Sequence, residues 1–234
     1  MPGDEITGEG LRIHQAVART LGMAILSGKH LPGASFGGEI DHSHALGISR
    51  TAYREALRIL IAKGLIESRP RAGTHVTPRA RWNLLDPEIL AWMFSGSPDE
   101  HFIRDLFELR GLIEPAAAAL AAARHSADQL ETMRAALDAM AAYGLATAEG
   151  RAADQVFHRA IFAAAGNEAL ASLASSVAAA VGWTTRFKQR HRALPRDPLP
   201  DHEAVFAAIS ARHPDAARAA MEELLRLALA DMGD

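Results

Sequence analysis

The segment SRTAYREALRILIAKGLIESRPRAGTHV, residues 49–76, constrains the fold of this chain more than any other stretch. A helix turns once every 3.6 residues, so Arg50, Arg54 and Arg58 fall on one broad face of a helix. The adjoining face is apolar and consists of Tyr53, Ala56, Leu57 and Leu60. The segment therefore predicts a helix over 50–63 that packs on one face and presents arginine on the other.

The sequence on either side of this helix completes a small unit. Ser49 is suited to cap the start of the helix and Gly64 to end it. After Gly64, the pieces LIES and THVTP predict two short strands joined by a Pro/Gly turn. Before Ser49, a four-residue apolar repeat predicts a helix over 11–27, and GGEIDHSHALG at 37–47 predicts a shorter one. Three helices followed by a hairpin make a winged helix-turn-helix.

The rest of the chain is almost entirely helical in pattern. Caps, apolar repeats and Gly/Pro punctuation predict helices over 86–94, 98–124, 127–143, 148–165, 167–192, 201–211 and 214–232. The predicted fold is therefore mainly α. It has an N-terminal winged helix-turn-helix domain over 1–78, a linker over 79–86, and a C-terminal all-helical antiparallel bundle of six to seven helices over 87–234.

Charge is unevenly distributed along the chain. Residues 1–80 contain ten Lys/Arg and seven Asp/Glu, an excess of three positive charges. The remainder contains 15 Lys/Arg and 21 Asp/Glu, an excess of six negative charges. A basic first third suggests that this part of the chain meets a polyanion and that the acidic remainder does not.

Composition excludes several kinds of site and location. The chain has no cysteine, which excludes disulfides and thiolate metal sites and suits a reducing cytoplasm. The N-terminal stretch MPGDEITGEG lacks the features of a signal peptide, and no charge-free apolar stretch reaches transmembrane length. We therefore expect a cytoplasmic protein with no membrane partner.

The arginine-bearing helix and hairpin predict binding to double-stranded DNA. In a helix-turn-helix, the N-terminus of the second helix enters the major groove, and the residues there are Ser49, Arg50, Thr51 and Arg54. Arginine can donate two hydrogen bonds to guanine, and hydroxyl groups suit phosphate oxygens. The hairpin candidates are Arg69, Arg71 and His75. A basic stripe alone usually means a solvated helix face, but the preceding helices and the hairpin favour DNA.

The same residues resemble the signature of GntR-type transcription regulators. In that family S-R-T-x-x-R-E-A-L is followed by G-L-I and by a wing that ends G-T-x-V. The resemblance implies a homodimer on a short palindromic operator, with Arg50, Thr51 and Arg54 on the DNA and Gly73 at the tip of the wing. The preceding helix differs, because FGGEIDH stands where L-P-S-E-x-x-L is common, so the operator sequence stays open.

The second half of the chain resembles the all-helical effector domain, the FCD domain, of the FadR branch of this family. The segments that carry the resemblance are ELRGLIEPAAAALAAARHS (108–126), ADQVFHRAIFAAAGNEAL (153–170) and DHEAVFAAISARHPDAARAAM (201–221). It implies that this domain binds the effector and forms the dimer. The stretch RARWNLLDPEILAWMF (79–94) is similar to the linker of galactonate-operon regulators, which implies a role in sugar-acid metabolism.

A candidate metal site begins with Asp154 and His158. Their four-residue spacing puts a carboxylate and an imidazole on one helix face, although such a pair is more often a surface or hydrogen-bonded pair. The resemblance implies that Asp154, His158 and His202 occupy three of the family's four ligand positions, and the fourth aligns with Leu224. We expect one divalent metal ion, Zn²⁺ first and Ni²⁺ or Mn²⁺ as alternatives, while a vestigial site without metal stays open.

The first candidate for holding the effector is Arg110. It is a cation inside an otherwise apolar helix, and it must find an anionic partner there. The resemblance implies that this arginine grips a ligand carboxylate, and the alternative is a buried pair with an Asp or Glu. Asn167, Trp183 and Arg186 are further candidates for the same cavity, although the last two equally suit the solvated end of a long helix.

The sequence therefore predicts a DNA-binding transcription regulator. We expect a repressor of a sugar-acid or related carboxylate catabolic operon, released from its operator by a small carboxylate effector such as an aldonate. The alternative is a metal-dependent helical enzyme that acts on a small sugar acid, because an Asp/His/His site with an open position can activate water. The sequence contains no G-x-S-x-G, P-loop or H-E-x-x-H motif that would favour that alternative.

Overall fold

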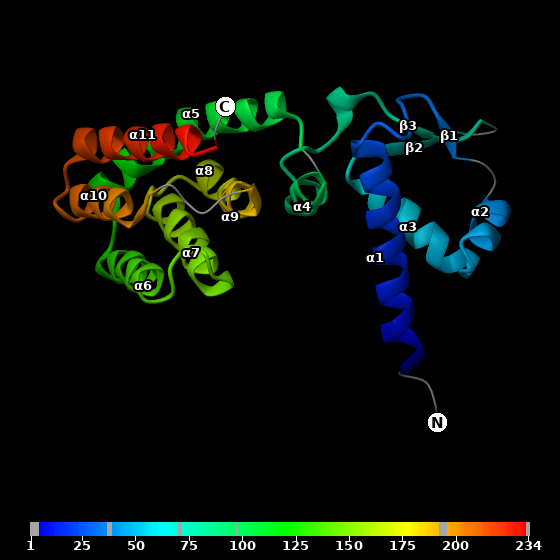
Figure 1. Ribbon diagram of the computed structural model, residues 1–234, viewed down its shortest axis with the longest axis horizontal. Coiled ribbons are helices and arrows are strands. Elements are labelled where there is room, and N and C mark those ends of the chain that lie inside the picture. The colour runs from blue at the N-terminus through cyan, green and yellow to red at the C-terminus, as the bar shows by residue number, and fades with distance from the viewer. Residues whose placement is uncertain (1–4, 37–38, 70–71, 97, 192–195, 233–234) are drawn as a thin grey trace. The chain divides into compact units, whose positions relative to one another are not determined.

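The computed structural model describes residues 5–36, 39–69, 72–96, 98–191 and 196–232, and it confirms a mainly α fold. The chain forms two compact units, Met1–Ser97 and Pro98–Asp234. The strands belong to the first unit, and the second contains the long helices α5 and α11 (Figure 1).

The first unit is the predicted winged helix-turn-helix. Its elements are α1 (Glu5–Leu26), β1 (Ser35–Phe36), α2 (Glu39–Ala45), α3 (Arg50–Ala62), β2 (Ile66–Arg69), β3 (Gly73–Val76), the 3₁₀ turn η1 (Arg79–Arg81) and α4 (Pro87–Ser95). The three strands are antiparallel in the order β1-β3-β2. In the hairpin Ile66 pairs with Val76 and Arg69 pairs with Gly73, so the wing extends away from the buried end of β2.

Helix α3 has the two faces that the periodicity predicts. The Ser49 hydroxyl accepts a hydrogen bond from the Ala52 amide at 3.1 Å, which satisfies an amide at the start of the helix. The buried side chains of the helix are Ala52, Tyr53, Ala56, Leu57 and Leu60, and they pack toward α1 and α2. Burial of this apolar face therefore holds the helix in place and leaves its arginines exposed.

The residues between the hairpin and α4 pack onto the rest of the first unit, to which they belong. The Trp82 indole is 9% exposed, and its Nε1 donates to the carbonyl and hydroxyl oxygens of Thr77, both at 3.1 Å. Lys63, in turn, pairs with Asp86 at 2.9 Å and Glu88 at 2.6 Å. The predicted linker over 79–86 is thus anchored in its middle, at Trp82, and at its end, at Asp86.

Helix α4 belongs to the first unit and packs on α1. The helical domain is predicted to begin at residue 87, whereas the two compact units divide after Ser97. The reason is the apolar face of α4, which buries Ile89, Leu90, Trp92, Met93 and Phe94. Gly22 of α1 allows this packing, because a Cβ there would lie 2.5 Å from the Trp92 ring.

The second unit contains seven helices within the described residues, as predicted for the bundle. They are α5 (Glu100–Arg124), α6 (Ala127–Tyr143), α7 (Ala148–Ala164), α8 (Glu168–Ser172), α9 (Ala174–His191), α10 (Leu199–Ser210) and α11 (Pro214–Ala230). The single helix predicted over 167–192 is instead two helices, which are separated at Leu173.

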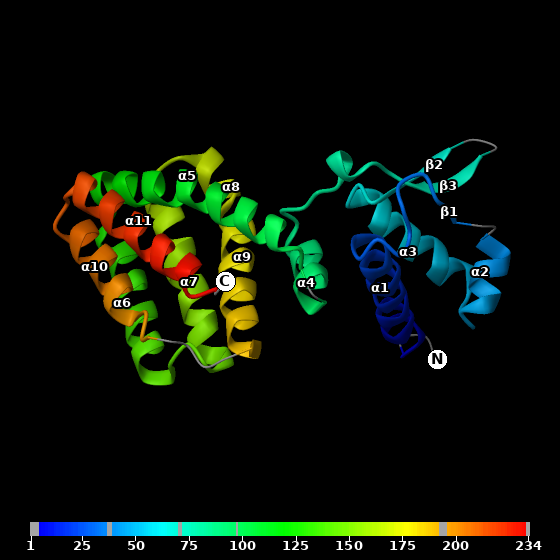
Figure 2. The ribbon, with the colours of Figure 1, turned by 45° about the horizontal axis from the view of Figure 1, so that its top comes forward.

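The core of the second unit lies between α5, α6, α7, α9, α10 and α11. Helix α11 runs along α5, and α7 lies between α6 and α9 (Figure 2). Small residues on α5, including Ala117, Ala118 and Ala121, let neighbouring helices approach closely, and Phe157 and Met133 fill the centre. This packing brings one face of α7 toward α9, α10 and α11, where the candidate site is found.

Candidate functional site

The predicted DNA-binding residues on α3 form an exposed group at its N-terminus. Arg50 and Thr51 are exposed, and Ser49 caps the helix. The Arg54 side chain is 62% exposed and its Nε lies 3.5 Å from Glu39 Oε2, a contact between two solvated groups that contributes little to stability. These side chains are therefore free of tight packing and oriented by a rigid helix.

The wing residues differ in their surroundings. Arg69 pairs with Glu67 at 2.5 Å, and Gly73 is exposed at the start of β3 with a φ of 86°. The His75 ring lies 2.7 Å from the Ala72 carbonyl oxygen, so it is held against the wing backbone. Arg71 lies outside the described residues.

In the second unit, Asp154 and His158 on α7 meet His202 on α10. All three side chains are buried, at 2%, 1% and 4% exposure, and their ligand atoms lie within 4.8 Å of one another. Asp154 Oδ1 is 3.1 Å from His202 Nε2 and 3.4 Å from His158 Nε2. The sequence-based grouping of these residues, hereafter the triad, is therefore matched by the geometry.

The other ring nitrogen of each triad histidine has its own acceptor. His158 Nδ1 lies 2.5 Å from Glu114 Oε2, and His202 Nδ1 lies 2.8 Å from the Pro198 carbonyl oxygen. With a hydrogen on each Nδ1, each Nε2 faces Asp154 Oδ1, to which it donates when it is protonated, and it can bind a metal ion when it is not. Metal-bound histidines are held in this way, because a second acceptor fixes the tautomer and the ring orientation.

Glu114 and the triad form a buried acidic and basic network. Burial would raise the pKa of Glu114, but Arg110 and His158 outweigh burial and lower this pKa to about 2. Burial would lower the pKa of His158, but Glu114 and Asp154 raise it to about 9. Two carboxylates around His158 therefore favour a positive charge at the triad, carried either by a proton or by a metal ion.

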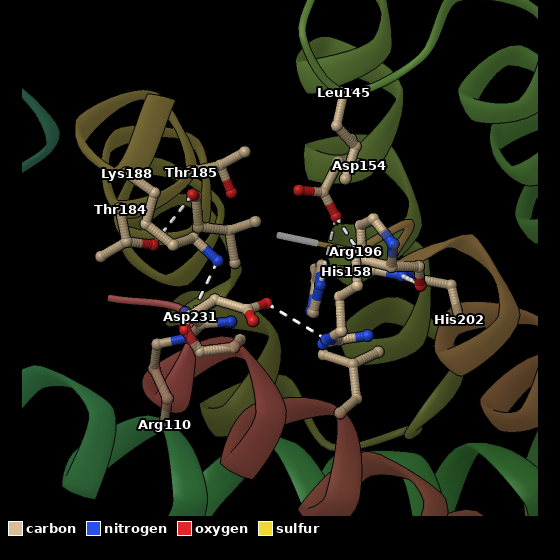
Figure 3. Close-up of a pocket in the computed structure, with 14 residues that line it drawn as sticks. Arg110, Leu145, Asp154, His158, Thr184, Thr185, Lys188, Arg196, His202 and Asp231 are labelled. Atoms are coloured by element: carbon tan, nitrogen blue, oxygen red, sulfur yellow. Dashed lines mark hydrogen bonds and ion pairs between the residues drawn. The ribbon is translucent and has the colours of Figure 1, made fainter. Parts of the chain in front are cut away.

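A small cavity opens beside the triad, and the volume in it that the centres of water molecules can occupy is about 30 Å³. Besides the triad and Arg110, its lining includes Leu145, Val181, Thr184, Thr185, Lys188, Arg196, Pro198, Leu224, Ala228 and Asp231. Figure 3 shows Lys188, Thr184, Thr185 and Arg110 on one side and the triad on the other. Leu224, at the position of the fourth family ligand, contributes an apolar wall.

Arg110 lies at this cavity but is already paired. Its Nε donates to Glu114 Oε1 at 2.6 Å, and both side chains are almost fully buried. The buried-pair alternative for Arg110 is thus present in the structure, together with a place in the cavity lining. Because Glu114 contacts His158 through its other oxygen, one carboxylate joins Arg110 to the triad.

The structure does not bring Asn167, Trp183 and Arg186 to this cavity. Asn167 caps α8, where its Oδ1 accepts a hydrogen bond from the Leu170 amide at 3.1 Å. The Arg186 guanidinium stacks 5.3 Å from the Trp183 ring, on a different face of α9 from the residues that line the cavity. These two residues therefore suit the solvated-helix alternative.

Several residues of the site were not identified from the sequence. They are Glu114, Thr184, Thr185, Lys188, Arg196 and Asp231. Glu114 could have been predicted as the partner of Arg110, because it lies four residues after Arg110 on the same predicted helix. Arg196 pairs with Asp201, which is close in sequence, and with Asp231 at 3.3 Å, and only the second partner depends on tertiary packing.

Two family profiles match this chain. The profile described as "Bacterial regulatory proteins, gntR family" matches residues 13–76, and the profile described as "FCD domain" matches residues 105–227. The first match covers the helix-turn-helix and the wing, and the second covers the triad, Glu114 and Arg110. In the described residues, no helix combines the length and apolar character that crossing a bilayer requires.

Curated relatives resemble the chain over most of its length. The "Galactonate operon transcriptional repressor" of Escherichia coli (strain K12) is 34% identical over 204 residues, 86% of this chain and 88% of that protein. The "Uncharacterized HTH-type transcriptional regulator YieP" of the same strain is 34% identical over 215 residues, 90% of this chain and 91% of that protein.

A solved structure supports the fold alone. It is described as "Lar controls the expression of the Listeria monocytogenes agr system and mediates virulence" and superposes with a TM-score of 0.66 at 15% identity. The match covers 94% of this chain and 95% of that one.

Proposed function

Since the chain belongs to the gntR family of bacterial regulatory proteins and carries an FCD domain, we propose that this transcription regulator is a repressor controlled by a small carboxylate. Its operon serves the catabolism of a sugar acid or a related carboxylate, and an aldonate is the first effector to test. The name of the galactonate operon repressor, which is 34% identical, supports this class of effector.

The observation that carries this proposal is the cavity beside the triad. It combines basic side chains, two threonine hydroxyls and a buried Asp/His/His cluster, a set that suits an anion with several hydroxyl groups. It lies in the FCD domain, whereas the exposed arginines of α3 lie in the other unit. A ligand in the cavity therefore affects the DNA-binding residues indirectly, through the chain that joins the two units. A homodimer has two DNA-binding units, and ligand binding changes their spacing.

The donor set of the triad fits a divalent metal ion. Two imidazole Nε2 atoms and one carboxylate suit Zn²⁺, with Ni²⁺ or Mn²⁺ as alternatives. Asp154, His158 and His202 would hold the ion, and it would supply a positive charge that attracts the effector's carboxylate and hydroxyl oxygens. Glu114 and the Pro198 carbonyl would keep the two rings oriented.

The enzyme alternative has no support from these observations. The relatives are described as transcription regulators, and the matched profiles are a DNA-binding family and its effector domain. The decisive experiment measures coupling between the two units. Fluorescence anisotropy with DNA from the region upstream of the gene gives operator affinity, with and without D-galactonate and other aldonates, hexuronates and dicarboxylates.

The effects of effector and operator on each other's affinity must be equal, which gives a second, independent test. An effector that weakens operator binding by some factor must itself bind more weakly to the operator complex by the same factor. Calorimetric titration of the effector into free and operator-bound protein measures that factor independently. Equal effector affinity in both titrations would exclude control of DNA binding by the ligand.

Arg50→Ala is expected to weaken operator binding by about 1–3 kcal/mol if Arg50 reads a base. The double variant Arg50→Ala, Arg54→Ala should lose specific binding and show a shallower salt dependence, because fewer phosphate counterions are released. Arg58→Ala is the matched control, since Arg58 is exposed on the same helix but pairs with Glu55 farther from the N-terminus. Wild-type affinity in the double variant would contradict the proposed DNA-binding face.

A further inference from the structure

We infer that Lys188 is the residue that binds the anionic group of the effector, ahead of Arg110. This inference rests on the proposed function, because it assumes a carboxylate ligand in the cavity beside the triad. It assigns the charge recognition to α9, which neither the matched family profiles nor the names of the relatives specify.

The first argument is the position of Lys188 on α9. Val181, Thr184, Thr185 and Lys188 recur at helical spacing and all line the cavity. Figure 3 shows the Lys188 amine directed into the region between α9, Asp231 and Arg110. Thr185 lies one turn before Lys188, so an ammonium group and a hydroxyl group can both reach one ligand carboxylate.

The second argument is that no carboxylate of the described residues pairs with Lys188. Among the described residues, its Nζ has one hydrogen bond, a long one of 3.4 Å to the Ala228 carbonyl oxygen, and no ion pair within 4.0 Å. Burial lowers the pKa of Lys188 to about 8, with nearby Arg110 and Arg196 acting in the same direction against Asp231 and Asp154. An ammonium group in this position is stabilised by an added anion.

The third argument is that the two arginines that line the cavity are already neutralised. Arg110 shares a buried ion pair with Glu114, so the pair has no net charge, although the Arg110 Nη atoms remain potential donors. Arg196 pairs with Asp201 and Asp231. Among the lysine and arginine side chains that line the cavity in the described part of the chain, Lys188 is therefore the one whose charge is available to a ligand.

The test compares Lys188→Met with Arg218→Met by calorimetric titration of the tightest-binding carboxylate from the panel of aldonates, hexuronates and dicarboxylates. Lys188→Met should raise the Kd by roughly ten- to a hundredfold, the loss expected for a charge-assisted hydrogen bond. Arg218→Met removes an exposed cation from α11 and should leave the Kd unchanged. Unliganded Lys188→Met should melt no lower than wild type, because the substitution removes an unpaired, partly buried charge.

Chemical labelling gives a second readout that does not need a variant. The chain has three lysines, 29, 63 and 188, so acetylation at each can be followed separately by mass spectrometry. Saturating carboxylate should slow acetylation of Lys188 and leave the rates at Lys29 and Lys63 unchanged.

The outcomes separate the two claims. If wild type binds a carboxylate but Lys188→Met binds it equally well, and Lys188 labelling is unaffected, the role of Lys188 is disproved and the proposed function survives. If wild type binds none of the panel, the proposed effector class fails, and the Lys188 inference fails with it.

Discussion

Glu114→Ala is expected to lower the free energy of unfolding by about 3–5 kcal/mol, because it leaves a buried guanidinium without its carboxylate. Glu114 accepts from Arg110 at 2.6 Å and contacts His158 at 2.5 Å, and its side chain is almost fully buried. The substitution therefore removes two charge-assisted contacts at once. Urea unfolding followed by circular dichroism measures the change.

Two further variants make this prediction specific. Glu108→Ala removes an exposed glutamate from the same helix and should change stability by no more than about 0.5 kcal/mol. The double variant Arg110→Met, Glu114→Met replaces the ion pair with apolar groups and should recover much of the lost stability. If Glu114→Ala is as mild as Glu108→Ala, the buried pair is not the stabilising contact described.

The pH dependence of this contribution has a definite sign. The folded pKa of Glu114, about 2, lies below its ordinary value of 4.5, so the folded state prefers the charged form. Its stabilising effect is therefore complete above pH 4.5 and is lost as the pH falls from 4.5 toward 2. The stability difference between wild type and Glu114→Gln should shrink over that interval.

Removing divalent metal with a chelator is expected to lower the free energy of unfolding by about 4 kcal/mol. The reference is protein in which the free metal concentration is about a thousand times the Kd of the metal for the folded protein. The reason is that the triad forms only when the fold brings His202 of α10 to Asp154 and His158 of α7, so the ion binds the folded state. Thermal unfolding with Zn²⁺, Ni²⁺ or Mn²⁺ and with chelator measures the difference, and elemental analysis gives the stoichiometry.

The control for the metal prediction is a histidine outside the triad. His158→Ala should abolish the response to chelator, whereas His101→Ala, at an exposed position of α5, should keep it. The rival account is a metal-free site in which a protonated His158 lies between Glu114 and Asp154. Metal-supplemented wild type that carries no stoichiometric ion and shows no chelator effect would establish that account.

The sequence was sufficient to predict the elements that depend on local pattern. Helix α3 buries the apolar face that its periodicity predicts, and Ser49 caps it. The wing follows from the Gly and Pro positions around two short β-rich stretches. The triad was also accessible, because two of its members share a helix face and the resemblance supplied the third.

Features that depend on contacts between distant segments could not be predicted from local sequence pattern. The pattern of 79–94 predicts a linker and a helix. It does not predict that Trp82 and Trp92 are buried in the first unit. Likewise, α9 offers cations on more than one face, and only its packing decides that Lys188 rather than Arg186 lines the cavity. Periodicity identifies faces of a helix without identifying which neighbour each face meets.

The buried Lys63 has a consequence for how this chain can be divided. It lies at the end of α3, and its two carboxylate partners, Asp86 and Glu88, lie at the start of α4. A chimera joined within 79–86 to another regulator's effector domain would separate this lysine from both partners and leave its ammonium group buried alone. Exchange of effector domains between relatives should therefore keep α4 with α3, and the junction belongs after Ser95.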